Sequence, residues 1–149
     1  MFEIESKKPD EITIITKKTA ITFDMANFMI DAGLAVGKIK GPGEFEIGEV
    51  TIRGIAVKDE KTIYDAEIGG VHVGIVAGIE DGLDDLGVSD VLCTSSVRAI
   101  REIEPKMVVA MGNVDAMVTD LKMTMRTEKK LKIKGLDSLA ATKEAVVLN

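Results

Sequence analysis

Apolar and polar residues alternate along much of the first half of the chain, with the period of two that is typical of strands with one buried face. The alternating segments are residues 11–16, 19–24, 43–47, 50–57, 62–68 and 71–78. Three short connections join them in pairs, and these are Lys17-Lys18, Gly48-Glu49 and Gly69-Gly70. Two adjacent glycines are a strong signal for a type I′ hairpin, whereas two lysines are a weaker one. The pattern therefore predicts a meander of antiparallel strands.

Residues 25–39 interrupt this alternation with a helix-like pattern. One side of the predicted helix is apolar and consists of Phe28, Met29, Ala32 and Val36. Asp24 stands just before the segment, where a carboxylate can accept hydrogen bonds from the first N–H groups of a helix. Gly33 and Gly37 lower the helix propensity, so we expect a short helix.

The sequence Gly41-Pro42-Gly43 follows this segment and predicts a tight turn. The glycines permit backbone conformations that are closed to other residues, and proline fixes φ between them. In the strand that follows, Glu44 and Glu46 are expected to point away from the core, towards solvent or a partner.

After residue 80 the pattern changes to strands that alternate with helices. Residues 91–95 and 106–112 are predicted as buried strands, and residues 96–104 and 113–125 as helices. Asn113 is the expected cap of the second helix, and Asp115 lies in its first turn, where a negative charge suits the helix dipole. Two closing strands are predicted at 130–135 and 144–149, with residues 139–143 between them. A single domain, residues 1–149, of the α/β (α+β) class is expected, with helices on at least one face of a sheet.

Composition narrows the class of protein. Of 149 residues, 46% are hydrophobic and only 3% are aromatic, so the core must be aliphatic. The net charge of −6 argues against non-specific binding to nucleic acid, which needs a basic surface. The sequence contains no apolar stretch long enough to span a membrane and no signal-peptide pattern. Cys93 is the one cysteine and cannot form an internal disulfide. We therefore expect a cytoplasmic protein that binds neither nucleic acid nor membrane.

Four segments carry a resemblance to a known family. They are, in chain order, GPGEFEIGEVTIRGI, TIYDAEIGGVHVGIVAG, REIEPKMVVAMGN and LKIKGLDSLAATKEAVVLN. In this order they resemble segments of the metallo-β-lactamase superfamily, in the branch of small Zn-dependent hydrolase-like proteins. Residues 11–24 resemble the first hairpin of that fold, which ends at Asp24. The resemblance implies an αββα sandwich, here in reduced form, with a dinuclear metal site at one edge.

The same resemblance implies that the metal ligands are missing. The family's H-x-H-x-D-H loop would lie between Asp24 and Gly41, where this chain has no histidine. The family's later ligands correspond to Ile75, Gly78 and Gly112, which we call the ligand-equivalent positions. None of these side chains carries a lone pair for zinc, and zinc is what activates the hydrolytic water. We therefore expect no cofactor and no zinc hydrolysis by the family mechanism.

A few other residues could carry chemistry. His72 lies in a strand and faces away from Val71 and Val73, as a surface or half-buried residue; one imidazole does not make a zinc site. Cys93 is expected to be a buried small hydrophobe, and as a nucleophile it would need His72 as its base. Asp81 belongs to an acidic segment, residues 80–90, which we interpret as a solvated loop before a helix, with a cation site as the alternative. The hydroxyls of residues 94–96 suit a helix cap or, alternatively, an anion.

Three functions follow from these observations. The first is a catalytically inactive metallo-β-lactamase-like protein that acts as a structural or protein-interaction module. It would form a homodimer through residues 25–36 or through a sheet edge, or bind another protein. The second is a divergent hydrolase that uses a different site, built from Asp24, Asp81, Asp115 or Cys93. The third is a binder of a small anion or a nucleotide that uses Gly78 and the helix start at Gly112-Asn113.

Overall fold

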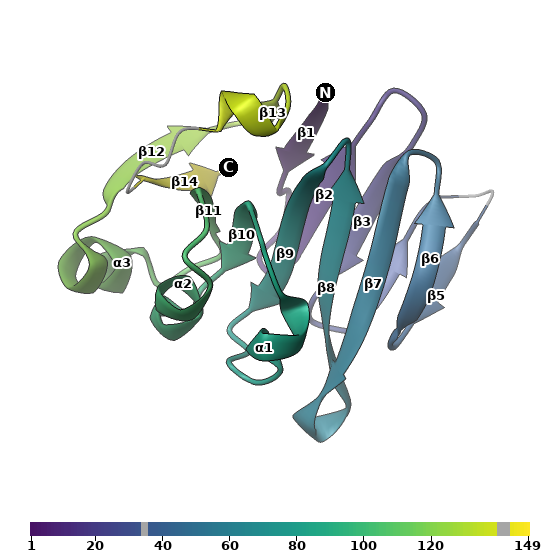
Figure 1. The fold of residues 1–149 in the computed structure, drawn as a ribbon, viewed down its shortest axis with the longest axis horizontal. Helices are drawn as coiled ribbons and strands as arrows, with labels where there is room; N and C mark the ends of the chain where they lie inside the picture. The colour runs from purple at the N-terminus through teal and green to yellow at the C-terminus, as the bar shows by residue number, and fades with distance from the viewer. Residues whose placement is uncertain (34–35, 140–143) are drawn as a thin grey trace.

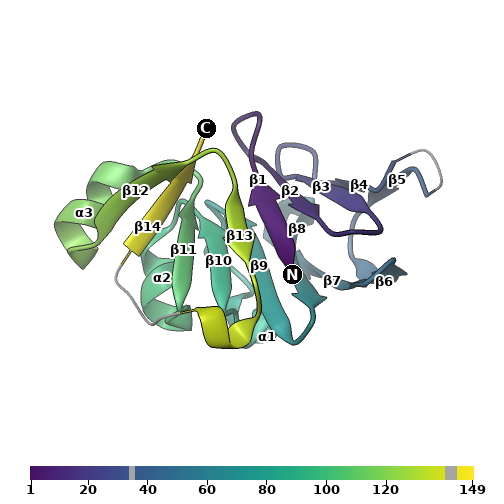
Figure 2. The ribbon, with the colours of Figure 1, turned by 90° about the horizontal axis from the view of Figure 1, so that it is seen from above.

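The computed structural model describes residues 1–33, 36–139 and 144–149. They form two β-sheets packed face to face, with three α-helices outside the larger sheet (Figures 1 and 2). The helices are α1 (Leu83–Leu86), α2 (Val97–Ile103) and α3 (Val114–Leu121), and the 3-10 turns are η1 (Lys58–Glu60) and η2 (Leu136–Ser138). None of the described helices is long and apolar enough to cross a bilayer.

The smaller sheet is antiparallel throughout and has the strand order β13-β1-β2-β3-β4-β5. Its strands are β1 (Phe2–Glu5), β2 (Glu11–Ile15), β3 (Ala20–Asp24), β4 (Met29–Asp31), β5 (Lys38–Lys40) and β13 (Leu131–Ile133). Alternate residues such as Ile14 and Ile21 are fully buried against the other sheet. Their neighbours Thr13 and Thr22 face outwards, where their hydroxyl oxygens lie 2.9 Å apart. This polar outer face can remain in contact with water.

The larger sheet has the order β12-β14-β11-β10-β9-β8-β7-β6. Its strands are β6 (Gly43–Ile47), β7 (Val50–Val57), β8 (Lys61–Ile68), β9 (Val71–Ala77), β10 (Val91–Thr94), β11 (Met107–Ala110), β12 (Thr124–Glu128) and β14 (Glu144–Leu148). Strands β6 to β9 are antiparallel neighbours, whereas β9, β10, β11, β14 and β12 run parallel. Helices on one face and the smaller sheet on the other bury the central parallel strands β10 and β11 on both sides, which explains their continuous apolar sequences.

The alternating pattern predicted the hairpins correctly. All six alternating segments form strands, and the two-glycine connection Gly69-Gly70 has positive φ at both residues, 56° and 81°. Lys17 and Lys18 lie within a longer loop between β2 and β3. In that loop Thr16 Oγ1 accepts hydrogen bonds from the backbone N–H groups of Lys18 and Thr19, at 3.2 and 3.1 Å. A side-chain acceptor thus stabilises this turn without glycine.

The helix expected over residues 25–39 is wrong. The described part of this segment forms the antiparallel strands β4 and β5, with Ile30 opposite Ile39, while residues 34–35 lie outside the described residues. Gly33 and Gly37 both have positive φ, and the Gly37 N–H donates to the Gly33 carbonyl at 2.7 Å. Burial of Ile30 between the sheets outweighs a weak helical pattern that two glycines had already compromised.

Asp24 accordingly caps a turn and no helix. Its Oδ1 accepts hydrogen bonds from the backbone N–H groups of Ala26 at 3.1 Å and Asn27 at 3.2 Å. The side chain of Asn27 donates to its Oδ2 at 2.8 Å. This last bond is the main reason that the pKa of Asp24 is lowered, because it favours the charged carboxylate.

Two further strands and one helix boundary were missed. β1 pairs with β2 and β13, and β12 takes up residues that had been expected to continue the helix over 113–125. That helix ends at Leu121, and Lys122 turns the chain with a φ of 55°. The expected helical layer outside each sheet is found outside the larger sheet only, as far as the described residues extend. The fold is therefore mostly β.

The turn Gly41-Pro42 carries the chain from β5 in one sheet to β6 in the other. Gly41 has a φ of 85°, which glycine adopts without strain, and its N–H donates to the carbonyl of Phe28 at 3.2 Å. Pro42 then packs close to Gly54 on β7. A Cβ at Gly54 would lie 3.3 Å from the Pro42 Cα and 3.2 Å from Cε1 of the buried Tyr64.

We predict that Gly54→Ala destabilises the protein by about 1–2 kcal/mol, because the added methyl group would overpack Pro42 and Tyr64. Urea unfolding would measure the change. Gly135→Ala is the matched control, because its φ of 164° is extended and no atom lies within 4 Å of the added Cβ. It should change the free energy of unfolding by less than about 0.5 kcal/mol. Equal effects of both substitutions would contradict the packing argument.

Candidate functional site

Two of the ligand-equivalent positions lie together at the carboxyl ends of three adjacent parallel strands. Gly78 follows β9, Ser95 follows β10 and Gly112 follows β11. A Cβ at Gly78 would lie 3.1 Å from Ser95 Oγ, and a Cβ at Gly112 would lie 4.0 Å from Ser95 Cβ. The two glycines therefore flank Ser95 at one edge of the larger sheet.

Hydrogen bonds tie these strand ends to one another. The carbonyl of Ala77 accepts hydrogen bonds from Thr94 Oγ1 at 2.6 Å and from the Ser95 N–H at 2.7 Å. The Met111 N–H donates to the carbonyl of Thr94 at 2.9 Å, and Asn113 Nδ2 donates to the carbonyl of Ser95 at 3.0 Å. These hydrogen bonds join the main chain of neighbouring strand ends, so the polar groups at this edge serve to stabilise the sheet.

Ile75 is the third ligand-equivalent position, and it is part of the core. Its side chain is fully buried between the sheets, and in the register of β8 and β9 it lies opposite Tyr64. The ring of Tyr64 in turn packs against Phe23, with the ring centroids 5.4 Å apart. Apolar packing occupies the place where the resemblance would put an imidazole.

The side chains at the ligand-equivalent positions do not fit the dinuclear zinc centre that the resemblance implies. Zinc needs nitrogen, sulfur or oxygen donors, and Ile75, Gly78 and Gly112 supply none from their side chains. Among the residues that the structure describes, no group of three or more His, Cys, Asp or Glu side chains could hold a metal ion. The carboxylate of Asp24 is engaged by Asn27 and the backbone of its own turn.

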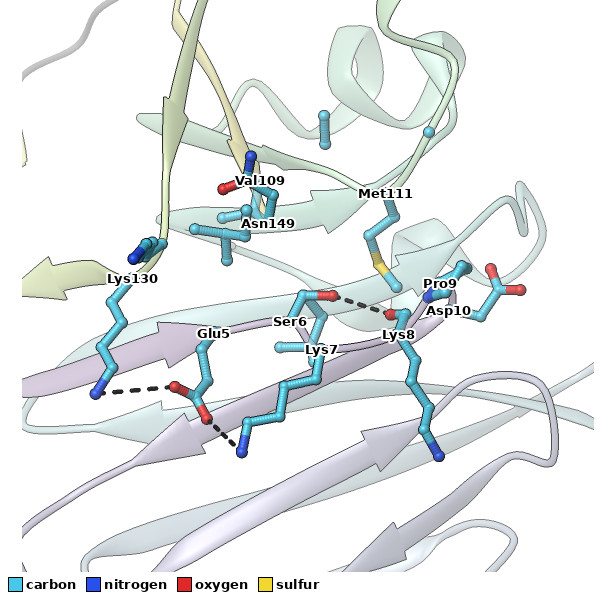
Figure 3. Close-up of a pocket in the computed structure, with 15 residues that line it drawn as sticks. Glu5, Ser6, Lys7, Lys8, Pro9, Asp10, Val109, Met111, Lys130 and Asn149 are labelled. Carbon is cyan, nitrogen blue, oxygen red and sulfur yellow. Dashed lines mark hydrogen bonds and ion pairs between the residues drawn. The ribbon is translucent and has the colours of Figure 1, made fainter.

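A cleft of about 680 Å³ opens beside Gly112, between the β1–β2 loop and the ends of β11 and β14 (Figure 3). Apolar side chains line much of it, and these are Ile12, Val109, Ala110, Met111 and Leu148. Some of the polar residues around it pair with one another. Glu5 forms ion pairs with Lys7 at 3.7 Å and Lys130 at 3.9 Å, and the hydroxyl of Ser6 donates to the carbonyl of Lys8 at 3.0 Å. The cleft thus offers shape and apolar surface without a reactive centre.

His72 lies on the opposite face of the larger sheet from Ile75, within a charged cluster. Its Nδ1 lies 3.2 Å from both carboxylate oxygens of Asp65, and its Nε2 lies 3.5 Å from Glu67. Arg53 Nη2 lies 3.9 Å from Asp65 and donates to the carbonyl of Leu86 at 2.8 Å. The imidazole is half-buried between two carboxylates, an arrangement that fixes its orientation.

Asp65 was not recognised from the sequence. It is 6% exposed, and this burial raises the pKa of its carboxyl group, although the contact with His72 partly opposes the change. Knowing which residues of neighbouring strands lie opposite each other would have revealed it. Glu67 lies opposite His72, and Arg53 lies opposite Asp65, on three adjacent strands. Sequence alternation alone does not align one strand with another.

Cys93 is fully buried on the face of β10 that packs against the smaller sheet. Burial raises the pKa of its thiol to about 12, so the thiolate that a nucleophile requires is not formed near neutral pH. His72 is directed to the other face of the same sheet, and the structure does not bring the two residues together.

The remaining candidates do not form a shared cluster with Asp24, His72 or Cys93 among the described residues. Asp81 Oδ2 accepts a hydrogen bond from the Lys58 N–H at 3.1 Å, and Asp115 is exposed in the first turn of α3. Asn113 occupies the position before α3, as predicted, but its side chain makes no capping hydrogen bond there. Ser96 does cap α2, because its Oγ accepts a hydrogen bond from the Ala99 N–H at 3.0 Å. Asp81, Asn113 and Ser96 thus hold the main chain through their hydrogen bonds.

No family model matches the chain, and no curated protein matches it. Its structure is similar to the crystal structure of a Thermotoga maritima protein that has been proposed to be a Zn-dependent hydrolase of the metallo-β-lactamase superfamily. The TM-score is 0.68 at 16% sequence identity, over 99% of this chain and 98% of the other. At this identity the likeness concerns the fold, which is therefore metallo-β-lactamase-like.

We predict that Asp65 makes folding stability fall as pH rises. A carboxyl group with a raised pKa in the folded state holds its proton there after the unfolded chain has released it. Its contribution is therefore fully present below the unfolded value of 3.8 and is lost as pH rises through the higher folded value. Relative to Asp65→Asn, the wild-type free energy of unfolding should decrease from about pH 4 upwards in urea titrations. A constant or increasing difference would contradict the burial argument.

We also predict that Cys93 does not react with a thiol reagent while the protein is folded. Ellman's reagent should release its chromophore only after denaturant has exposed the side chain, because the thiol is both inaccessible and protonated. A Val88→Cys variant provides a reactive control, because Val88 is 71% exposed. Rapid reaction of wild-type protein in native buffer would restore Cys93 as a candidate nucleophile.

Proposed function

We propose that this chain is a noncatalytic protein of the metallo-β-lactamase fold that acts as a structural or protein-interaction module. The observation that supports the proposal most directly is the absence of donor atoms from the side chains of Ile75, Gly78 and Gly112. Two of these positions meet at the strand ends, and the third is buried in the core.

Zinc hydrolysis needs a set of donors that hold the metal and leave one position open for water. The sequence contains one histidine, and His72 lies between Asp65 and Glu67 on the other face of the larger sheet. That single imidazole cannot contribute to a centre built around Gly78 and Gly112. The chain therefore keeps the scaffold of the fold without the means to activate water in the way that family members do.

Two alternative functions have less support. A divergent hydrolase would need its acid, base and nucleophile to meet. Asp24 and Asp81 accept hydrogen bonds from backbone N–H groups, Asp115 is exposed on α3, and Cys93 is buried between the sheets. A small-anion or nucleotide site at the strand ends would use Gly78 and the helix start at Gly112-Asn113. The side-chain amide of Asn113, however, already donates to the carbonyl of Ser95. An interaction module requires no such constellation.

We predict that the protein, purified without chelator, contains well below one zinc ion per chain by plasma mass spectrometry. It should also fail to hydrolyse a chromogenic ester, phosphodiester or β-lactam with or without added zinc, because donors are lacking at the strand ends. His72→Gln is the control for adventitious binding, because any zinc lost with this substitution was held by the surface imidazole. Stoichiometric zinc that persists in His72→Gln, together with hydrolysis, would refute the proposal.

A further inference from the structure

Both sheets end on the same side of the molecule in unpaired edge strands. β5 pairs only with β4, and β6 pairs only with β7, among the described residues. Because Gly41 and Pro42 join the two strands directly, their free edges lie close together (Figures 1 and 2). We call this side of the molecule the β5/β6 edge. A free edge presents N–H and C=O groups that can pair with another strand.

The side chains of the β5/β6 edge alternate in the same way on both strands. On β5, Lys38 and Lys40 are exposed on the outer face, whereas Ile39 is half-buried and packs against the inter-sheet core. On β6, Glu44 and Glu46 are exposed on the outer face. Phe45 lies between them, is half-buried and also packs against that core.

The two strands thus carry opposite charges. The charge of Lys38 is partly engaged within the chain, because it adds to the hydrogen bond from Asn27 in lowering the pKa of Asp24. The register places Asp31 beside Lys38 and Arg53 beside Glu44. Even so, none of the two lysines and two glutamates makes an ion pair within 4.0 Å to another residue in the described part of the chain. The β12 edge of the larger sheet differs, because its Arg126 is paired with Glu144 at 3.0 Å and with Glu128 at 3.8 Å.

Charge decides which strands of two copies could pair across this edge. A β5–β5 pair would place lysines opposite lysines, and a β6–β6 pair would place glutamates opposite glutamates, both of which are unfavourable. A β5–β6 pair places lysines opposite glutamates on the outer face. On the inner face it brings Ile39 against the partner's Phe45 and so continues the apolar core.

A twofold axis makes this pairing twice. When β5 of one copy meets β6 of the second copy, the symmetry brings β6 of the first copy to β5 of the second. The smaller sheet of each subunit then continues into the larger sheet of its partner. Both free edges are covered, and no edge on this side remains to recruit a further copy.

We propose, as a more specific form of the interaction function above, that the chain forms a twofold homodimer through the β5/β6 edge. In this dimer Lys38 and Lys40 pair with the partner's Glu44 and Glu46. The partner is therefore a second copy of this chain, and the contact combines main-chain pairing, four potential ion pairs and two apolar contacts.

A charge-swap experiment tests this pairing by light scattering after size exclusion and by sedimentation equilibrium. Wild-type protein should have twice the 16.0 kDa mass of one chain. K38E/K40E makes both strands acidic, and E44K/E46K makes both basic, so each variant alone should dissociate at least about tenfold more readily. An equimolar mixture of the two should form a heterodimer, because acidic strands then face basic ones. The fourfold swap K38E/K40E/E44K/E46K should restore the homodimer.

The control is K132E/K134E, which reverses the charge of two exposed lysines away from the β5/β6 edge. Lys132 lies in β13, and Lys134 directly follows it. It should leave dimerisation unchanged, and circular dichroism should confirm that every variant is folded. A monomeric wild type at about 100 μM, or charge variants that dimerise as wild type does, would overturn the proposed dimer. The zinc measurement would be unaffected by that result, so the noncatalytic function and the dimer can fail separately.

Discussion

The burial of two aliphatic sheet faces against each other is the constraint on which the rest of the structure depends. Aromatic residues make up 3% of the chain, so branched aliphatic side chains must fill the space between the sheets. Fully buried residues such as Ile14, Ile21, Ile52 and Ile75 come from both sheets. Alternation along the strands of the smaller sheet is the consequence, because a shift of one residue would turn the buried set out to solvent. Packing between the sheets thereby decides which side chains of each strand face the core and which face outwards.

This constraint helps to explain why the side chains at the ligand-equivalent positions carry no donor atoms for a metal. Ile75 belongs to the inward-facing set, so its methyl groups contribute to the apolar core that holds the sheets together. Gly78 and Gly112 lie just beyond the strands, where Ser95 occupies the space between them and the carbonyl of Ser95 accepts from Asn113. At these positions the described contacts stabilise the scaffold, where the resemblance would place metal ligands.

Local signals in the sequence determined how much of the fold could be predicted. Alternation together with paired glycines at 69–70 identified hairpins, because both depend on neighbouring residues. The helix predicted for residues 25–39 failed because burial of Ile30 depends on a sheet formed by distant strands. β12 was missed for the same reason, since its partner is β14, and β1 has the distant strand β13 as one of its two partners. In the candidate site, the sequence was enough to single out His72. Its contact with Asp65 could not be predicted, because that contact depends on how β8 and β9 align.

The turn at Gly41 and Pro42 joins an edge strand of the smaller sheet to an edge strand of the larger sheet. By passing directly from one sheet to the other, it leaves both sheets with an edge on the same side. Lysines on an edge strand usually prevent pairing with other chains, and a chain that needed only protection could carry the same charge on both edges. Here β5 carries lysines and β6 carries glutamates, which disfavours pairing of like strands and favours pairing of unlike ones. This combination of repulsion and attraction is characteristic of an edge that selects a partner, because specificity requires the wrong pairing to be unfavourable as well as the right one favourable.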